Sequence, residues 1–248
     1  MTDETVTIRI DGFAHGGRGV GRVDGKAVFV TGALPGELVE AAITADRRRW
    51  AEGHLVRVLE PAEGRVEPPC RYVPNCGGCD LQHADPGLQL ALLTRVVAEQ
   101  LERLGGVTEP PVAPCRAVGP PLGYRRNVQL HANDHGQLGF HRAGTHDVVP
   151  IDRCLVAVDA VNGVLAELPG SGGADQVVIR ADDHGVALVL HPGSGPLDVP
   201  TVAADIHVSQ PDGTTVTLRG RDSLEQTVAD IRYGYGAGDF FQVNADGA

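Results

Sequence analysis

The spacing of the cysteines gives the clearest chemical signal in the sequence. Cys70, Cys76 and Cys79 lie within ten positions of one another, and Cys154 follows much further along the chain. Four thiolates could ligate one soft metal centre, and both tetrahedral zinc and iron–sulfur clusters use four sulfur ligands. Two glycines between Cys76 and Cys79 carry no side chain, so their backbone N–H groups could approach a bound sulfide. The spacing alone leaves zinc, an iron–sulfur cluster and unrelated buried thiols open.

Arginines beside aromatic residues form a second group with possible chemistry. Arg125 and Arg126 directly follow Tyr124. This combination of cation and stacking face is typical of sites that hold the splayed bases of single-stranded nucleic acid. Ordinary solvated charges explain Arg18 and Arg22 better than phosphate contacts do, and they explain Arg48 nearly as well. These three are the candidates from the N-terminal part.

The overall charge does not by itself favour a nucleic-acid partner. The chain has 21 Lys and Arg against 32 Asp and Glu, a formal net charge of −11. A protein this acidic lacks the broad basic field that attracts nucleic acids. Most of the acidic excess lies after residue 71, so the N-terminal part is nearly balanced.

Short strands and tight turns are expected to position these groups, because the chain contains 33 Gly and 17 Pro. Alternating apolar residues and turn signals predict about five strands over residues 5–60, which fits a small OB-like barrel. Repeated prolines exclude a regular helix or central strand from residues 61–84. A helix is predicted after Asp85 as its N-cap. Strands that alternate with turns after residue 124 predict a mixed antiparallel α+β domain.

No targeting or membrane-spanning segment is evident in the sequence. It contains no run of about 18 apolar residues, and its first residues lack the basic flank and apolar core of a signal peptide. We therefore expect a cytoplasmic protein with no membrane partner.

Five segments, in order along the chain, resemble the bacterial TRAM-containing RNA 5-methyluridine methyltransferases. The most specific is the cysteine-rich stretch 69–83, which resembles the cluster loop of that family. The resemblance covers nearly the whole chain and implies four parts. They are a TRAM OB-like β-barrel (1–60), a cysteine-rich iron–sulfur loop (61–84), a central α+β RNA-binding domain (85–238) and the start of the methyl-donor segment (239–248). The other four segments are residues 25–37, 123–127, 139–154 and 239–244.

The resemblance also implies cofactors and a partner. It implies a 4Fe-4S cluster, held by the four cysteines named above, that folds and positions the RNA-binding surface. Gln242 in the Phe-Phe-Gln-Val-Asn segment is implied to contact S-adenosylmethionine. The implied partner is RNA, with 23S rRNA ahead of tRNA, and Tyr124, Arg125 and Arg126 stand at the entry of the RNA-facing strand.

The sequence ends where members of that family continue into a Rossmann-like methyltransferase domain. Methylation of uracil C5 needs a thiolate that adds to C6 and a base that removes the C5 proton, and neither matching residue is present. We therefore expect an α+β chain from which the Rossmann-like domain is absent. Such a chain would be the RNA-binding and iron–sulfur portion of an S-adenosylmethionine-dependent RNA uridine-C5 methyltransferase. It would have no catalytic residue, would be inactive alone and would have a separate catalytic domain as a candidate partner.

Two alternatives remain open on the sequence. One is a stand-alone RNA-binding module without catalysis, and the other is a zinc-stabilised protein-interaction domain.

Overall fold

A computed structural model of the protein describes residues 5–73 and 75–248, which divide into two compact units. The first unit comprises Met1–Pro74 with Cys79–Arg116, and the second comprises Asn75–Gly78 with Ala117–Ala248. These bounds differ from the predicted domain bounds of 60, 84 and 238. The difference arises because a four-residue piece of the cysteine-rich stretch belongs to the second unit, while the helix that follows belongs to the first.

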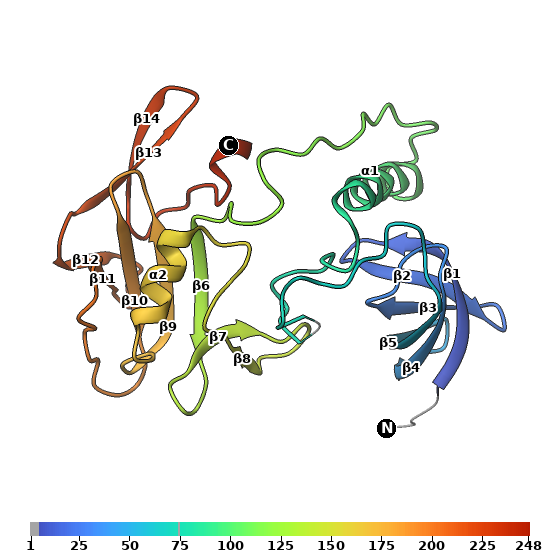
Figure 1. Ribbon diagram of the computed structural model, residues 1–248, viewed down its shortest axis with the longest axis horizontal. Helices are drawn as coiled ribbons and strands as arrows, with labels where there is room; N and C mark the ends of the chain where they lie inside the picture. The colour runs from blue at the N-terminus through green and yellow to red at the C-terminus, as the bar shows by residue number, and fades with distance from the viewer. Residues whose placement is uncertain (1–4, 74) are drawn as a thin grey trace. The chain divides into compact units, whose positions relative to one another are not determined.

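Five strands of the first unit close into a barrel in the order β1-β2-β3-β5-β4 (Figure 1). All neighbours are antiparallel except β3 and β5, which run parallel. The strands are β1 (Thr5–Ala14), β2 (Arg18–Val23), β3 (Lys26–Thr31), β4 (Leu38–Asp46) and β5 (Trp50–Glu60).

The barrel forms because its strands alternate apolar and polar side chains, which places every second residue inside. Ile8 and Ile10 of β1 lie in the core with Val28 and Val30 of β3, and all four are almost fully buried. Gly21 lets β1 and β2 approach closely, since a Cβ there would lie 2.3 Å from the Arg9 carbonyl oxygen. The alternating pattern predicted from the sequence is thus confirmed for these strands.

A long helix, α1 (Pro86–Arg103), belongs to the first unit. The Asp85 side chain caps it by accepting a hydrogen bond of 2.8 Å from the Leu88 amide, and proline occupies the first turn. Leu92 of α1 packs with Phe13 and Leu34 in a small core between helix and barrel. The helix predicted after Asp85 is therefore confirmed. No helix among residues 5–73 and 75–248 has the length and apolar character needed to span a membrane.

A buried ion pair ties residues 61–73 to the barrel. The Glu37 side chain is fully buried and its carboxylate accepts hydrogen bonds from the Arg65 guanidinium and from the Leu34 amide, the latter at 2.8 Å. Arg65 also donates to the Gly32 carbonyl at 2.7 Å. Because both partners are well hydrogen-bonded, the pair can hold a chain segment that has no regular structure of its own.

The second unit is built on a seven-stranded sheet with the order β12-β11-β10-β9-β6-β7-β8 (Figure 1). Only β10 and β11 pair in parallel. The strands are β6 (Asn127–Ala132), β7 (Leu138–His141), β8 (Val148–Pro150), β9 (Ala174–Ala181), β10 (Val186–Pro192), β11 (Asp205–Ser209) and β12 (Thr215–Arg219).

Both faces of this sheet are covered near its centre. Helix α2 (Asp159–Glu167) packs on one face, where Val161 and Leu165 join Leu188 and Leu190 of β10 in the main core. On the other face, alternate residues of β10 pack with Leu224. Leu224 belongs to a two-stranded hairpin, β13 (Ser223–Val228) and β14 (Ile231–Gly236). A short 3-10 turn, η1 (Ala245–Gly247), lies at the end of the chain.

Candidate nucleic-acid interface

Polar side chains of one strand line a pocket of about 360 Å³ in the second unit. Arg125, Asn127, Gln129 and His131 occupy every second position in and just before β6, so they share one face of the strand. The intervening Val128 and Leu130 point into the main core on the opposite face. We call this cavity the β6 pocket. Its other lining residues are Gly77, Gly78, Phe140, His141 and Val243.

Two buried polar atoms of the pocket residues have no hydrogen-bond partner among the described residues: Arg125 Nε, a donor, and Asn127 Oδ1, an acceptor. The backbone around them is held firmly. The Arg125 amide donates to the Val156 carbonyl at 2.7 Å, and the Arg126 amide donates to the Val243 carbonyl at 2.8 Å. Buried polar groups are nearly always satisfied in folded proteins, so these two atoms are exceptions.

Three histidines cluster at the end of β6. The rings of His131 and His141 stack with centroids 3.9 Å apart, and His146 meets His141 edge-on at 5.4 Å. Burial first, and then the nearby His141 and His146, lower the pKa of His131. A neutral His131 ring therefore prevails at neutral pH and presents a flat stacking surface with His141. Sequence spacing gave no reason to group these residues. They come together only in the folded chain, where β6 pairs with β7.

The predicted RNA-binding residues of this strand lie on both of its faces. Arg125 lines the β6 pocket, whereas Arg126 donates hydrogen bonds of 3.2 Å to Asp183 and to Gln226. Burial acts to raise the pKa of Asp183, but hydrogen bonds from Thr227 and the charge of Arg126 hold that pKa below its usual value. Arg126 is thus engaged by an ionised carboxylate. Tyr124 is half-buried beside them.

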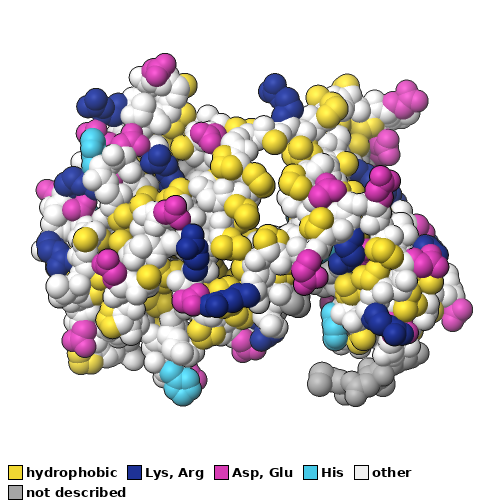
Figure 2. Space-filling model, viewed as in Figure 1, with side chains coloured by type: hydrophobic (Ala, Val, Ile, Leu, Met, Phe, Trp, Pro, Cys, Tyr) yellow, Lys and Arg dark blue, Asp and Glu magenta, His cyan; other side chains and the backbone are white. Residues whose placement is uncertain are grey.

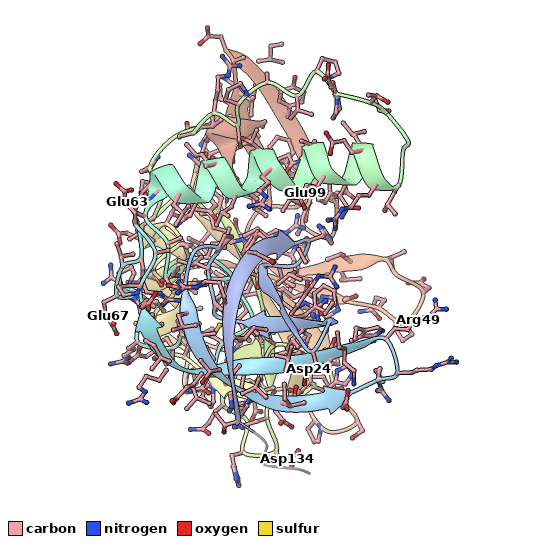
Figure 3. All side chains as sticks on the ribbon, turned by 90° about the vertical axis from the view of Figure 1, so that its right-hand side faces the viewer. Asp24, Arg49, Glu63, Glu67, Glu99 and Asp134 are labelled. Carbon is pink, nitrogen blue, oxygen red and sulfur yellow. The ribbon has the colours of Figure 1, made fainter. Side chains whose placement is uncertain are left out.

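The arginines predicted in the barrel have mixed environments. Arg18 lies 5.1 Å from the centroid of the Phe29 ring and donates to Glu52 at 2.8 Å. Arg22 donates to the Gly25 carbonyl at 3.1 Å across the turn between β2 and β3. Arg48 is exposed in the turn between β4 and β5, and Figure 3 shows the adjacent Arg49 extending away from the barrel. On the face drawn in Figure 2, basic and acidic side chains are interspersed and form no single basic patch.

Cys76 and Cys154 belong to the second unit and have well-defined surroundings there. The Gly78 amide donates to Cys76 Sγ at 3.4 Å. The Cys154 amide donates to Asn162 Oδ1 at 2.8 Å, and the Asn162 side-chain amide donates back to the Cys154 carbonyl at 3.0 Å. Gly77 of the loop is sterically required, since a Cβ there would lie 2.8 Å from the His141 carbonyl oxygen.

Cys70 and Cys79 belong to the first unit. The Cys70 amide donates to the Gln82 side chain at 3.3 Å. Within residues 5–73 and 75–248 the structure contains no group of three or more His, Cys, Asp or Glu residues arranged to hold a metal ion. The four predicted cluster ligands are thus divided between the two units, and their joint ligation of one metal centre stays a prediction.

The segment that carries Gln242 runs beside the start of β6. Val243 accepts a hydrogen bond from Arg126, and Asn244 forms an isolated bridge with Arg125. Gln242 itself is exposed. Just before it, the Phe241 ring stacks on Tyr235 of β14 with centroids 4.7 Å apart, and Phe240 is 81% exposed.

Comparison with known proteins places this geometry in context. Residues 1–56 match the TRAM domain family. An RNA methyltransferase of Streptomyces coelicolor, described as uncharacterized, is 32% identical over 100% of this chain and 59% of its own length. The 23S rRNA (uracil(1939)-C(5))-methyltransferase of Alkalilimnicola ehrlichii is 34% identical over 98% of this chain and 60% of its own length. The chain is thus similar to these RNA methyltransferases over nearly its whole length. It spans about three fifths of their length.

The fold of the chain also matches a solved structure. The tRNA (uracil-54, C5)-methyltransferase of Pyrococcus abyssi, solved in complex with S-adenosyl-L-homocysteine, superposes with a TM-score of 0.65 at 20% identity. The match covers 100% of this chain and 63% of the Pyrococcus chain. At this identity the match concerns the fold.

These comparisons correct two predictions made from the sequence. The absence of a Rossmann-like methyltransferase domain, and the inactive fragment inferred from it, were both read from the position of the last residue. Relatives named as methyltransferases match this chain from end to end, and so does the fold of a methyltransferase. Both predictions are therefore wrong, because the similarity to proteins named as methyltransferases extends over the whole chain.

Proposed function

We propose that the protein is an S-adenosylmethionine-dependent RNA uracil-C5 methyltransferase that acts in the cytoplasm. The observation that carries this proposal is the end-to-end similarity to relatives named as RNA methyltransferases, one of them specific for uracil C5 of 23S rRNA. The TRAM match at residues 1–56 supports RNA as the substrate. We propose 23S rRNA as the first candidate substrate, with tRNA as the second.

The residues of this chain have two proposed tasks in that function. One task is RNA binding: the β6 pocket contacts bases, and the exposed Arg22 and Arg48 contact phosphates. The other task is cofactor binding. Gln242 contacts S-adenosylmethionine, which supplies the methyl group. Its exposed position supports that role, and so does the attachment of the neighbouring Val243 and Asn244 to the start of β6.

We further propose that Cys70, Cys76, Cys79 and Cys154 ligate a 4Fe-4S cluster. The donor set suits it, because such a cluster takes four thiolates. The Gly78 N–H that donates to Cys76 Sγ is the kind of hydrogen bond that tunes cluster sulfurs. Iron and sulfide analysis of anaerobically purified protein tests the proposal. About four iron atoms per chain are expected. Stoichiometric zinc without iron would contradict the cluster and indicate a structural zinc site.

Methyl transfer tests the function itself. The full-length protein is incubated with S-adenosylmethionine labelled in its methyl group and with unmodified 23S rRNA or tRNA transcripts. We expect label in 5-methyluridine of one RNA class, and the class that is labelled decides between the two substrates. Label in neither RNA under conditions where the protein binds RNA would favour the stand-alone RNA-binding module.

A further inference from the structure

Trp50 of β5 lies on the outer face of the barrel and is the only tryptophan of the chain. It is 37% exposed, although a large aromatic side chain gains more than most from burial. Phe29 of β3 contacts it from the side, with ring centroids 6.2 Å apart and ring planes at 85° to each other. The indole is therefore braced by a neighbouring ring and still accessible to a ligand.

Cross-strand pairing places Trp50 in one row with Arg22 and Ala27. Arg22 of β2 pairs with Ala27 of β3, and Ala27 pairs with Trp50. Residues paired directly across neighbouring strands point to the same face of a sheet. Because Ala27 carries only a methyl group, this row holds nothing bulky between the cation and the indole. One face of the barrel thus presents a flat ring together with a positive charge.

The turn before Trp50 adds further positive charge. Its residues 47–49 are all arginines, and all three are exposed. Among the residues that the structure describes, none of the three forms an ion pair, and Figure 3 shows Arg49 extending away from the barrel. The Arg47 amide donates to the Trp50 carbonyl at 2.9 Å, so this turn is fixed to the strand that carries the indole. Exposed guanidinium groups without a carboxylate partner are well suited to bind phosphate.

Single-stranded RNA carries both of the groups that this face can bind. Its unpaired bases stack on aromatic side chains, while the adjoining phosphates pair with arginine. In OB-like barrels, oligonucleotides bind on the face of the second and third strands and at the loop between the fourth and fifth. Here these parts are the face of β2 and β3 and the turn 47–49. Helical RNA fits this face less well, because its bases are already stacked on one another.

We propose that the Trp50 indole stacks with one unpaired base of the RNA, while Arg22 and the arginines at 47–49 contact the adjoining phosphates. This inference rests on the proposed RNA substrate and adds a base contact to the phosphate contacts of the barrel. It makes the barrel selective for single-stranded segments over helical ones.

The single tryptophan makes this contact directly observable, because all indole fluorescence of the chain comes from Trp50. The full chain is titrated at low salt with a five-residue oligocytidylate and with an abasic ribose-phosphate chain of the same length. We expect the oligocytidylate to change the indole fluorescence and to protect the indole from quenching by acrylamide, and the abasic chain to do neither. The oligocytidylate should also bind about tenfold more tightly than the abasic chain.

Substitutions test whether the ring itself provides the base preference. Trp50→Leu should lower the affinity for oligocytidylate about tenfold and change that for the abasic chain less than twofold, whereas Trp50→Phe keeps a flat ring and should retain most of the preference. Val56→Ala is the matched control, because Val56 is a 53% exposed apolar residue six positions further along the same strand. It should leave both affinities unchanged. Thermal unfolding of each variant shows whether the barrel is still folded.

Three results would overturn the inference. They are equal affinity for the two short chains, an indole that stays open to acrylamide while RNA is bound, and a base preference that survives Trp50→Leu. The fluorescence of the unmodified chain decides the question even if Trp50→Leu does not fold.

Failure of the proposed function would look different. In that case the chain would bind neither 23S rRNA nor tRNA transcripts, which serve as positive controls for RNA binding. Binding of a transcript without any change in the fluorescence of Trp50 would overturn the base contact alone.

Discussion

At the scale of single residues, Asn162 offers the sharpest test of how Cys154 is positioned. Its buried side chain accepts from the Cys154 amide and donates to the Cys154 and Ala157 carbonyls at 3.0 and 3.1 Å. Asn162→Ala removes all three bonds and leaves buried backbone groups unsatisfied, so we expect a loss of about 2 to 3 kcal/mol in the free energy of unfolding. Urea denaturation measures it.

Asp159→Asn on the same helix is the control, because the Asp159 side chain is 95% exposed and its ion pair with Arg153 is long at 3.2 Å. That substitution should change stability by less than about 0.5 kcal/mol. Equal effects from the two variants would show that Asn162 does not anchor the Cys154 segment.

The residue scale also shows what the sequence could and could not indicate. Arg125 was selected because it stands beside Tyr124, and it does line the β6 pocket. Asn127, Gln129 and His131 were missed, although the alternation of polar and apolar residues in this strand carried the signal. His141 could not have been found in this way, because only the pairing of β6 with β7 places its ring on His131.

At the scale of elements, the Glu37–Arg65 pair should decide how well residues 61–73 stay on the barrel. Glu37→Gln leaves the Arg65 guanidinium, which is only 18% exposed, without its counter-ion. We expect a loss of about 3 to 5 kcal/mol in the free energy of unfolding of the first unit. Hydrogen exchange of the amides of residues 61–73 shows whether the stability is lost there.

The barrel contains a matched exposed pair, Glu40 with Arg57, whose Arg side chain is 65% exposed. Glu40→Gln should cost about 1 kcal/mol or less. If Glu37→Gln were as mild as Glu40→Gln, the buried pair could not be what holds the stretch in place.

The pH dependence of the same region follows from His83, which precedes α1 and is buried. Burial first, and then the positive charge of Arg65, lower the pKa of His83 to about 4. The unfolded chain, with a pKa near 6.5, binds the proton more readily, so acid favours unfolding. Stability should therefore fall as pH drops from about 6.5 to about 4, by as much as about 3 kcal/mol.

Denaturation of His83→Leu and of the unmodified protein across this pH window gives the free energy of unfolding of each as a function of pH. The difference between the two slopes measures the contribution of His83. Exposed His135 provides the substitution control, His135→Leu. An unchanged slope in His83→Leu would mean that His83 is not the group whose protonation destabilises the first unit.

Local patterns predicted the elements well where the signal is short-range. Asp85 and Pro86 begin α1 as expected, and Asp24 and Gly25, both with positive φ, form the two-residue turn between β2 and β3. The buried partnership of Glu37 with Arg65 joins residues 28 positions apart. No local pattern encodes such a contact.

At the scale of the whole molecule, the acidic charge limits how the protein binds RNA. With a net charge of −11 the attraction must come from a few local cations together with stacking. If Arg18, Arg22, Arg48 and Arg125 each displace one counter-ion from single-stranded RNA, the logarithm of affinity should fall with the logarithm of salt concentration with a slope of about −3. Titrations at several salt concentrations measure this slope. A slope near zero would exclude phosphate contacts by these residues. A slope steeper than about −6 would require basic side chains beyond these four to contact the RNA.

Whole-molecule properties were the hardest to read from the sequence. The cysteine-rich stretch was predicted as one loop, yet residues 75–78 group with the second unit, because Gly77 and Cys76 pair with the β7 end at His141 and Arg142. The prediction that the protein is inactive was wrong for a different reason. It rested on the lack of a thiolate and a base in these 248 residues, whereas the relatives it resembles are longer than this chain.

The most direct test of the central claim is the 5-methyluridine content of cellular RNA, measured by mass spectrometry in the source organism with and without the intact gene. We predict that deletion removes 5-methyluridine from a defined position in 23S rRNA or in tRNA, and that the intact gene restores it. Unchanged 5-methyluridine in both RNA classes after deletion would contradict the assignment of this protein as an RNA uracil-C5 methyltransferase.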